Sequence, residues 1–140
     1  MTKKLLLLSV FAVLATATAN AQERFRLKVT VPFSFYVGQS AMAAGEYEVR
    51  THSASNHVLI FYSADTKSVA TTFITPALKM DRQEKGKLIF NRYGSEYFLA
   101  EVWNANSNGG GEIKKTRREL EVAAAGSPNP QTAALYAKSR

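Results

Sequence analysis

Apolar residues occupy every odd position from 25 to 37, and this alternation restricts the fold more than any other feature of the chain. The set consists of Phe25, Leu27, Val29, Val31, Phe33, Phe35 and Val37. A period of two predicts a β-strand with one buried face and one solvated face. Because Pro32 interrupts the pattern and proline cannot donate to a strand ladder, the segment is predicted to lie at a sheet edge or to bend between two sheets.

Strand character continues through the middle of the chain. Residues 44–50 join a glycine turn to a short strand with Tyr47 and Val49 inward, and residues 57–63 include a solid apolar run that predicts a strand covered on both faces. Residues 68–74 are rich in β-branched residues, and the intervening turn residues predict a hairpin. The remaining segments are predicted to be connections: loops at 38–44 and 51–56, a charged connection at 77–86 after Thr75-Pro76 ends the strand, and a flexible glycine-rich loop at 104–111.

The stretch LIFNRYGSEYFLAEVW, residues 88–103, is predicted to be a second hairpin. Gly94 stands at the first central position of a two-residue turn, where a positive φ is required. In this register the facing pairs are Phe90–Leu99, Arg92–Tyr97 and Leu88–Glu101, with Trp103 further along the same face. Since the opposite face is also apolar, the hairpin is expected to be central, with one face on the core and the other partly covered by a loop or the C-terminal segment.

The C-terminal part predicts the only helix. Residues 112–125 are good helix formers, in which Ile113, Leu120 and Ala124 would face inward, and Gly126 with Pro128 provides the stop. Residues 131–138 fit either a helix or a short strand. Six to eight strands with one C-terminal helix predict a single β-rich domain over residues 22–140, built as an antiparallel β-sandwich or a small open barrel.

The first residues have the features of a secretory signal peptide. Lysines at positions 3 and 4 precede an apolar run over residues 5–15, which is shorter than the about 20 residues of a membrane-spanning helix. Small residues before position 22 predict cleavage after Ala21, so residues 1–21 are assigned to the signal peptide and the protein to the periplasm or the medium. The sequence contains no cysteine, which excludes disulfides and lipid attachment at the cleavage site. No integral membrane span is expected after cleavage.

Several motifs together form a signature. They are VPFSF at 31–35, AGEY at 44–47, LIFNRYG at 88–94 with YFLAEVW at 97–103, and RREL at 117–120. The chain resembles a family of small exported bacterial proteins whose function is unknown. Members often carry Leu-Pro before the Ala-Gly-x-Tyr turn, where this chain has Met42-Ala43, and they tend to end in a β-branched stretch, which favours a strand over 132–138. The turn also resembles one in secreted immunoglobulin-like and transthyretin-like sandwich modules, in which the tyrosine packs at the corner. The resemblance implies no activity, substrate or cofactor.

Arg92, Tyr97 and Trp103 are candidate ligand-binding residues, because the predicted register places them in one row. Aromatic rings stack on sugar faces, and arginine adds hydrogen bonds and cation–π contacts. The competing interpretation is core packing, which explains most large apolar clusters at strand spacing. Exposure of Trp103 separates the two interpretations.

Lys114, Lys115, Arg117 and Arg118 form the densest basic run and are candidates for contact with an anionic glycan or lipid surface, an attraction that salt would weaken. The alternative is a solvated helix face with four-residue pairs from Lys115 to Glu119 and from Arg117 to Glu121. Removal of Lys3 and Lys4 with the signal peptide would lower the formal net charge from +7 to +5, which predicts weak surface attraction at most, and nucleic acid is not expected as a partner of an exported protein.

Candidate catalytic groups are sparse. The two histidines, His52 and His57, lack a third nearby metal ligand, and the adjacent serines lack the strained turn of a nucleophile elbow. Glu46, Glu48 and Glu101 would suit glycoside hydrolysis only if two carboxylates were held about 5–10 Å apart, and each also fits an outward or ion-paired strand position. No metal and no cofactor is predicted.

The sequence therefore predicts a secreted or periplasmic, non-enzymatic β-sandwich protein that serves as a binding or structural module of the cell envelope. An envelope glycan or an envelope protein is the candidate partner. The alternatives are a glycan- or small-ligand-binding β-barrel and a small glycan-active hydrolase. The break at Pro32 also predicts that the first strand offers an edge to a partner strand. The pattern leaves the oligomeric state open.

Overall fold

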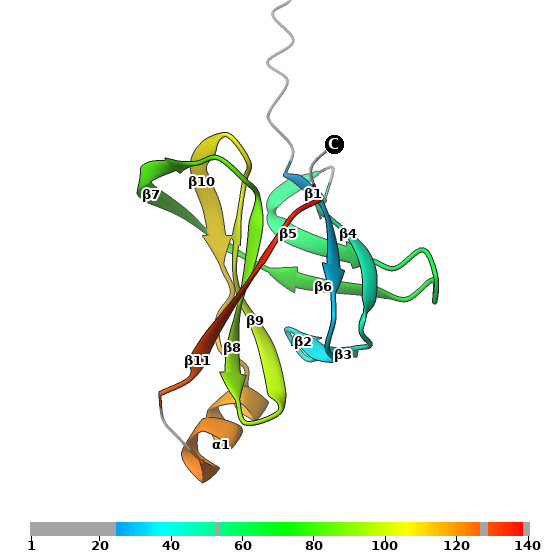
Figure 1. Cartoon of the computed structure of the whole chain (residues 1–140), viewed down its shortest axis with the longest axis vertical. Helices are drawn as coiled ribbons and strands as arrows, with labels where there is room; N and C mark the ends of the chain where they lie inside the picture. Colours follow the sequence, from blue (N-terminus) through cyan, green and yellow to red (C-terminus); the bar gives the residue numbers. More distant parts are fainter. Residues whose placement is uncertain (1–24, 53, 127–128, 139–140) are drawn as a thin grey trace, which may run out of the picture.

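The structure is a computed structural model that describes residues 25–52, 54–126 and 129–138. The predicted signal peptide and the cleavage point after Ala21 lie outside the described residues. Strands β1 to β11 and the single helix α1 make up the regular structure of the described part, so the fold is mainly β as predicted (Figure 1). Among the described residues, no helix has the length and the apolar character needed to cross a membrane.

Sheet A contains four antiparallel strands in the order β1-β4-β5-β6. These strands are β1 (Arg26–Val31), β4 (Gly45–His52), β5 (Ser55–Tyr62) and β6 (Val69–Phe73). The alternation of apolar residues from position 25 matches the burial of β1, in which Leu27, Val29 and Val31 are buried and the residues between them are exposed. Tyr47 and Val49 of β4 also point inward, as predicted.

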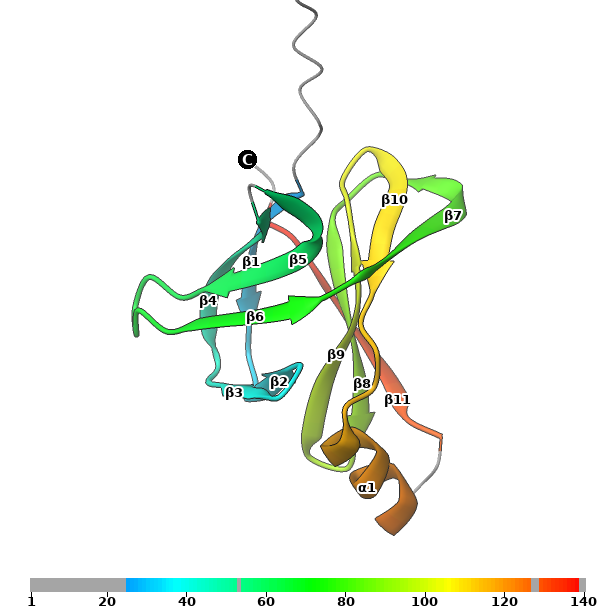
Figure 2. The same ribbon diagram turned by 180° about the vertical axis from the view of Figure 1, so that it is seen from behind.

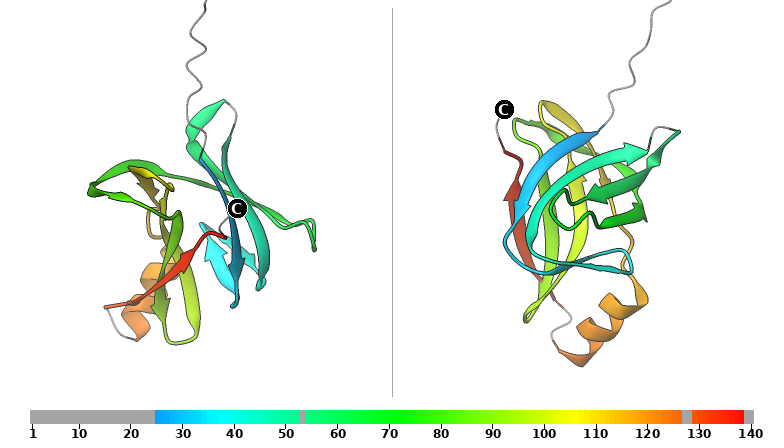
Figure 3. Two further views of the ribbon diagram at one scale, coloured as in Figure 1. Left: turned by 45° about the horizontal axis from the view of Figure 1, so that its top comes forward. Right: turned by 90° about the vertical axis from the view of Figure 1, so that its right-hand side faces the viewer.

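Sheet B lies against sheet A as the second layer (Figure 3). Its main order is β11-β8-β9-β10-β7, and a short β2–β3 hairpin joins it through a bridge between β2 and β9. The bounds are β2 (Phe35–Val37), β3 (Ser40–Met42), β7 (Thr75–Gln83), β8 (Lys87–Tyr93), β9 (Glu96–Trp103), β10 (Ser107–Glu112) and β11 (Gln131–Tyr136). The two sheets form a sandwich, which is one of the two predicted architectures, and residues 131–136 form a strand.

The chain passes between the sheets at three points, one of which is the connection at residues 43–44 between β3 of sheet B and β4 of sheet A. Pro32 lies between β1 of sheet A and β2 of sheet B, which fulfils the prediction of a bend, and Ile74 alone separates β6 from β7 (Figure 2). The backbone N–H of Lys138 donates to the carbonyl of Lys28 in β1 at 2.9 Å. The edge of the first strand, which the sequence offered to a partner, is therefore met by the chain's own C-terminal segment.

The core between the sheets is centred on Phe35. Its ring makes edge contacts with Tyr47 of β4 and Phe90 of β8, at centroid distances of 5.2 and 5.5 Å, and lies 6.0 Å from Phe61 of β5. The hydroxyl of Tyr47 donates to the carbonyl of Ala43 at 2.6 Å. The tyrosine of the AGEY turn thus packs at its corner, as the resemblance to sandwich modules implies.

Three predicted connections are strands instead, which raises the strand count above the expected six to eight. Residues 40–42 form β3, residues 75–83 form β7 and residues 107–112 form β10. Two glycines of β10 lie where a side chain would clash with a neighbouring residue. A Cβ on Gly110 would lie 2.4 Å from a ring carbon of Trp103, and one on Gly111 would lie 3.0 Å from Ile74. These glycines make room for neighbouring side chains within a strand, and the prediction of a flexible loop was wrong.

Helix α1 (Arg117–Ala125) is shorter than the predicted helix over 112–125. Glu112 belongs to β10, and Thr116 caps the helix by accepting a hydrogen bond from the Glu119 N–H at 3.2 Å. Of the residues expected to face inward, Ile113 precedes the helix and packs against the core, whereas Leu120 and Ala124 are exposed, so the prediction was wrong for these two. The buried residue of the helix is Glu119, which is 3% exposed.

Candidate functional site

The predicted row of Arg92, Tyr97 and Trp103 does not exist, because β9 contains a bulge. Gly94 has the predicted positive φ of 61°, and the pairs nearest the turn follow the predicted register, with Arg92 opposite Tyr97 and Phe90 opposite Leu99. Beyond them the register shifts by one residue, so Ile89 rather than Leu88 faces Glu101. A one-residue shift moves every later side chain to the other face. Trp103 therefore lies on the opposite face from Tyr97.

Trp103 is a packing residue of the outer face of sheet B. Its side chain is 3% exposed and occupies the space that a side chain at Gly110 would need. The indole N–H donates to the Glu101 carboxylate at 2.7 Å, and the ammonium of Lys79 lies 4.4 Å from the ring centroid. Burial removes the aromatic anchor of the proposed glycan site, and Glu101 is held by Trp103 and by Lys79 at 4.0 Å.

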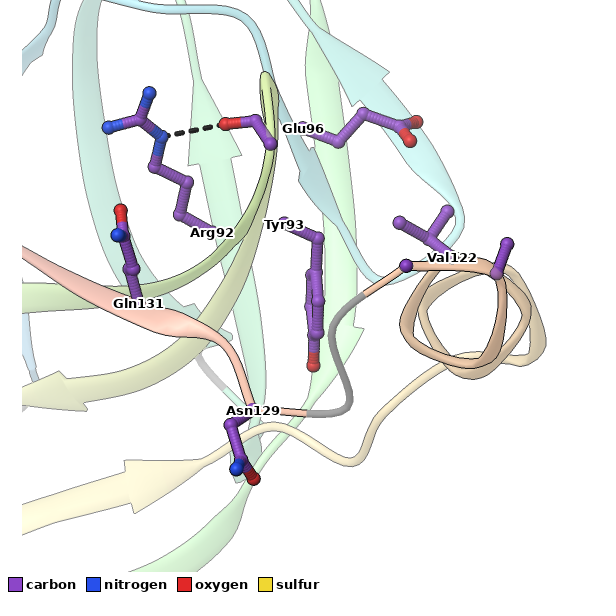
Figure 4. Close-up of a pocket in the computed structure, with 9 residues that line it drawn as sticks. Arg92, Tyr93, Glu96, Val122, Asn129 and Gln131 are labelled. Atoms are coloured by element: carbon purple, nitrogen blue, oxygen red, sulfur yellow. Dashed lines mark hydrogen bonds between the residues drawn. The ribbon is translucent and has the colours of Figure 1, made fainter.

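The other two residues of the row remain near the surface. The Tyr97 ring stacks on Phe33 with centroids 3.7 Å apart, and the guanidinium of Arg92 lies 5.4 Å from the same ring. Arg92 also donates from its Nε to the carbonyl of Gly94 at 2.7 Å (Figure 4). Both contacts hold the tip of the β8–β9 hairpin in place.

A cleft of about 670 Å³ separates this hairpin tip from the C-terminal end of α1 and the start of β11. Its described lining comprises Arg92, Tyr93, Gly94, Glu96, Val122, Ala125, Gly126, Asn129 and Gln131 (Figure 4). The charged groups already have partners, since Glu96 accepts from Arg118 at 2.6 Å and Arg92 is bonded to Gly94. The cleft therefore presents a mixed surface, in which Glu96 contributes to the attachment of α1 and Arg92 is bonded within the hairpin tip.

Glu119 attaches α1 to sheet B. Its carboxylate accepts hydrogen bonds from the Asn91 amide at 2.9 Å and from the Tyr93 hydroxyl at 3.1 Å. Burial, followed by the nearby carboxylate, raises the pKa of Tyr93, while Lys115 opposes the shift. The sequence contained a signal for this residue, because Thr116 and Glu119 have the spacing of a capping box. In the structure the glutamate side chain reaches the sheet, a use that the spacing alone does not reveal.

The basic run does not form one charged surface. Arg118 pairs with Glu96 and lies over Tyr36 at 5.2 Å, and Arg117 pairs with Glu121 at 3.0 Å, as the helical spacing predicted. Lys114 and Lys115 precede the helix and are exposed, so the predicted helical pair between Lys115 and Glu119 is not available. The prediction of an anionic contact therefore rests on Lys114 and Lys115.

The histidines and the remaining carboxylates lie apart from one another. His52 and His57 are exposed at the β4–β5 turn, and in the described ranges no group of three or more His, Cys, Asp or Glu side chains is close enough to hold a metal ion. In the described contacts the Ser55 hydroxyl does not donate to either imidazole. It accepts a hydrogen bond from the backbone N–H of His57. Glu48 pairs with Arg26 at 3.0 Å, and Glu46 pairs with Lys138, whose hydrogen bond lowers the pKa of Glu46.

The feature that sequence reasoning missed is an uncovered apolar surface on sheet A. We call it the β5–β6 outer face, and it consists of Val58, Ile60, Tyr62, Val69, Thr71 and Phe73, which pair across the two strands as Val58–Phe73, Ile60–Thr71 and Tyr62–Val69. Phe73 is 78% exposed and Val69 is 57% exposed. The right-hand view of Figure 3 looks onto this side of sheet A. The apolar run over 58–62 was the available signal, and the expected cover on its second face is missing from the described chain.

Comparison of the chain with family models, with curated proteins and with solved structures finds no match.

Proposed function

We propose that this protein is an exported, non-enzymatic β-sandwich module of the cell envelope that binds a partner protein through the β5–β6 outer face. The observation that carries the proposal is the exposure of Phe73 and Val69 beside a strand that is apolar on both faces. Monomeric soluble proteins seldom leave contiguous apolar surface uncovered unless it serves an interaction. Export rests on the signal-peptide features of residues 1–21.

The chemistry of this face favours a protein over a glycan. Sugar recognition uses flat aromatic rings with polar groups beside them, whereas four of the six residues on this face are β-branched and its two aromatic residues, Tyr62 and Phe73, lie at opposite ends of it. The tryptophan considered for sugar stacking is buried against Gly110. Apolar surface of this kind is typical of the buried centre of a protein–protein interface.

The carboxylates considered for hydrolysis support a structural role. Glu101 is hydrogen-bonded to Trp103, Glu48 is paired with Arg26, and Glu46 is paired with Lys138. A catalytic carboxylate must instead reach the substrate and, in a hydrolase, work with a second one. We therefore assign these groups to the stability of the sandwich.

Site-specific photocrosslinking in exporting cells tests the proposal. A photoreactive phenylalanine analogue replaces Phe73, and the matched control carries it at Leu120, an apolar residue of α1 that is 55% exposed. We expect one discrete adduct in the envelope fraction from position 73 and none from position 120. The cross-linked protein is then purified and titrated with wild type, Phe73→Ala and Leu120→Ala. Loss of at least about tenfold in affinity for Phe73→Ala alone supports the proposal. Equal adducts at both positions, or equal affinities, contradict it.

A further inference from the structure

Hydrogen bonds at both ends of the β5–β6 hairpin determine which backbone groups of β6 are free. The Ile74 N–H donates to the His57 carbonyl at 2.8 Å, and the Ser63 N–H donates to the Ser68 carbonyl at 3.0 Å. In an antiparallel pair, residues that bond to the partner strand alternate with residues that do not. Even-numbered residues from 68 to 74 therefore direct their N–H and C=O groups toward β5, and odd-numbered residues direct theirs away from it.

Val69, Thr71 and Phe73 consequently present their backbone groups at the edge of sheet A. The strand order ends at β6, and no other described strand pairs with it on that side (Figure 2). These are also residues whose side chains belong to the β5–β6 outer face. One short strand thus offers unpaired backbone groups and apolar side chains together.

The edge of β6 lacks the features that usually prevent strand addition. Proteins protect exposed edges with charged residues, proline or bulges. Its sequence, VATTF, has none of these residues. By contrast, β7 contains Pro76 and a shift in register, and the edge of β1 carries Arg26 and Lys28 and is met by Lys138. Among these three edges, only that of β6 lacks protective residues of its own, and the β2–β3 turn lies beside its middle, with Gly38 against Thr72 and near the Thr71 carbonyl.

A groove of about 490 Å³ runs beside this edge. Residues 71–73 of β6 line one side, and the turn at 38–40 together with the segment before α1 lines the other. Val58 and Ile113 add apolar surface to it. An added strand lies about 4.7–4.9 Å from its neighbour, so its backbone would run along this groove.

The charges near the groove select the partner. Lys114 is the only charged residue among the described residues that line it. Acidic side chains would therefore be favoured in the bound segment. A second copy of this chain is a poor occupant by the same reasoning, because without Lys3 and Lys4 of the signal peptide its formal net charge would fall from +7 to +5 and stay positive.

We propose that an extended segment of the partner protein, with alternating apolar and acidic side chains, adds as a fifth strand to the free edge of β6. The inference rests on the proposed function and specifies the form in which the partner binds. Backbone hydrogen bonds to Val69, Thr71 and Phe73 supply the attachment, the β5–β6 outer face receives alternate apolar side chains, and Lys114 contacts an acidic one.

Amide hydrogen exchange with synthetic peptides tests this form of binding. The probe is a soluble decapeptide of alternating valine and glutamate, and its control replaces glutamate with lysine. We expect the acidic peptide to bind with a Kd of about 1 mM or tighter and the basic one at least about tenfold more weakly. On binding, the amides of Thr71 and Phe73 should become protected, whereas the amide of Thr72, which already faces β5, should change little. Binding without this alternation of protection would overturn strand addition, as would the absence of binding.

Three substitutions and a modified peptide make the test independent of folding defects. Thr71→Pro removes one outward N–H while leaving the bonds to β5, and Thr71→Ala is the matched control. Methylation of alternate peptide amides removes the same bonds from the ligand and leaves the protein unchanged. Lys114→Glu should reverse the preference between the two peptides, and an unchanged preference would contradict the charge argument.

The two proposals can fail separately. If position 73 forms a specific adduct with a partner but the amides of Thr71 and Phe73 gain no protection from the peptide, the outer face binds without strand addition. If no adduct forms at position 73 and the peptide nevertheless protects these amides, the edge binds strands but the proposed role of the outer face is wrong.

Discussion

The outer faces of the two sheets differ in how much of their apolar surface the chain itself covers. On sheet B, the Phe98 ring stacks on Tyr36 with centroids 4.9 Å apart, and Trp103 fills the space above Gly110. On sheet A, Phe73 and its neighbours across β5 and β6 stay exposed. Both faces are rich in apolar residues, and on sheet B other parts of the same chain cover the centre of the face around Phe98 and Trp103.

This difference shows why aromatic content alone does not locate a binding surface. The aromatic hairpin over 88–103 has more large rings than β5 and β6, and on the outer face of sheet B its rings are buried under β2, α1 and the neighbouring strands. Strands β5 and β6 contain fewer aromatic rings, yet they keep apolar side chains exposed to solvent. A binding surface is therefore identified by apolar side chains that no other segment of the chain buries. Which side chains these are depends on contacts between segments that are distant in the sequence.

The comparison is tested most strongly by removing one phenylalanine ring from each face. Phe98→Ala deletes a buried ring and is expected to lower the free energy of unfolding by about 3–5 kcal/mol. Phe73→Ala deletes an exposed ring and should change it by less than about 0.5 kcal/mol. Urea unfolding followed by circular dichroism measures both. Similar losses would mean that the two faces are equally covered.

A smaller effect is expected from adding a methyl group beneath Trp103. In Gly110→Ala the new Cβ would meet the Trp103 ring and the Val102 carbonyl, at 2.4 and 2.3 Å, so we expect a loss of about 3 kcal/mol from overpacking. Gly109→Ala is the control, because its nearest neighbour would be 3.4 Å away. Thermal unfolding distinguishes the two variants. Equal stability would show that the glycine at 110 is not needed for the cover of sheet B.

Removing the carboxylate that attaches α1 to sheet B should lower the free energy of unfolding somewhat less than Gly110→Ala does. Glu119→Ala leaves the Asn91 amide and the Tyr93 hydroxyl without their carboxylate partner, and unsatisfied groups of this kind cost about 1–3 kcal/mol in total stability. Glu121→Ala removes an exposed carboxylate of the same helix and should change stability by less than about 0.5 kcal/mol. Denaturant unfolding of both variants provides the measurement, and a neutral Glu119→Ala would refute the role given to this residue.

The smallest predicted effect is a dependence on alkaline pH. The pKa of Tyr93 is raised in the folded protein above its ordinary value of 10.0, mainly by burial. The stability that the protonated Tyr93 hydroxyl contributes is therefore fully present below about pH 10. It is lost as the pH rises through the folded-state pKa, because the unfolded state releases the hydroxyl proton first. Stability of Tyr93→Phe should fall less steeply than that of wild type above pH 10. Parallel curves in urea unfolding at increasing pH would contradict the assignment.

Local patterns accounted for much of the fold. The alternation ending at Val37 predicted which residues of β1 and β2 are buried, Pro32 marked the passage between sheets, and Gly94 set the turn of the β8–β9 hairpin. These features depend on the geometry of a few consecutive residues. The strands β7 and β10 escaped prediction because charged residues and three glycines are typical of loops, and only the contact with Trp103 reveals their purpose.

The candidate site was less accessible to sequence reasoning for two physical reasons. The bulge beside Leu99 adds one residue to β9 without any local signal, and it moved Trp103 away from the face of Tyr97. The exposure of Phe73 depends on which distant segments pack against sheet A, which periodicity does not specify. The apolar run over 58–62 showed that both faces of β5 carry apolar side chains. In the structure, other parts of the chain bury one of these faces and leave the other partly exposed.

The bond between Lys138 and Lys28 gives the C-terminal segment a role in the timing of folding. It joins positions near opposite ends of the described chain, so the seam between β1 and the residues after β11 cannot close until the last part of the chain is present. Contacts between such distant positions slow folding. The outer edge of β1 would consequently stay open after β1 has paired with β4, until residues 137–138 reach it.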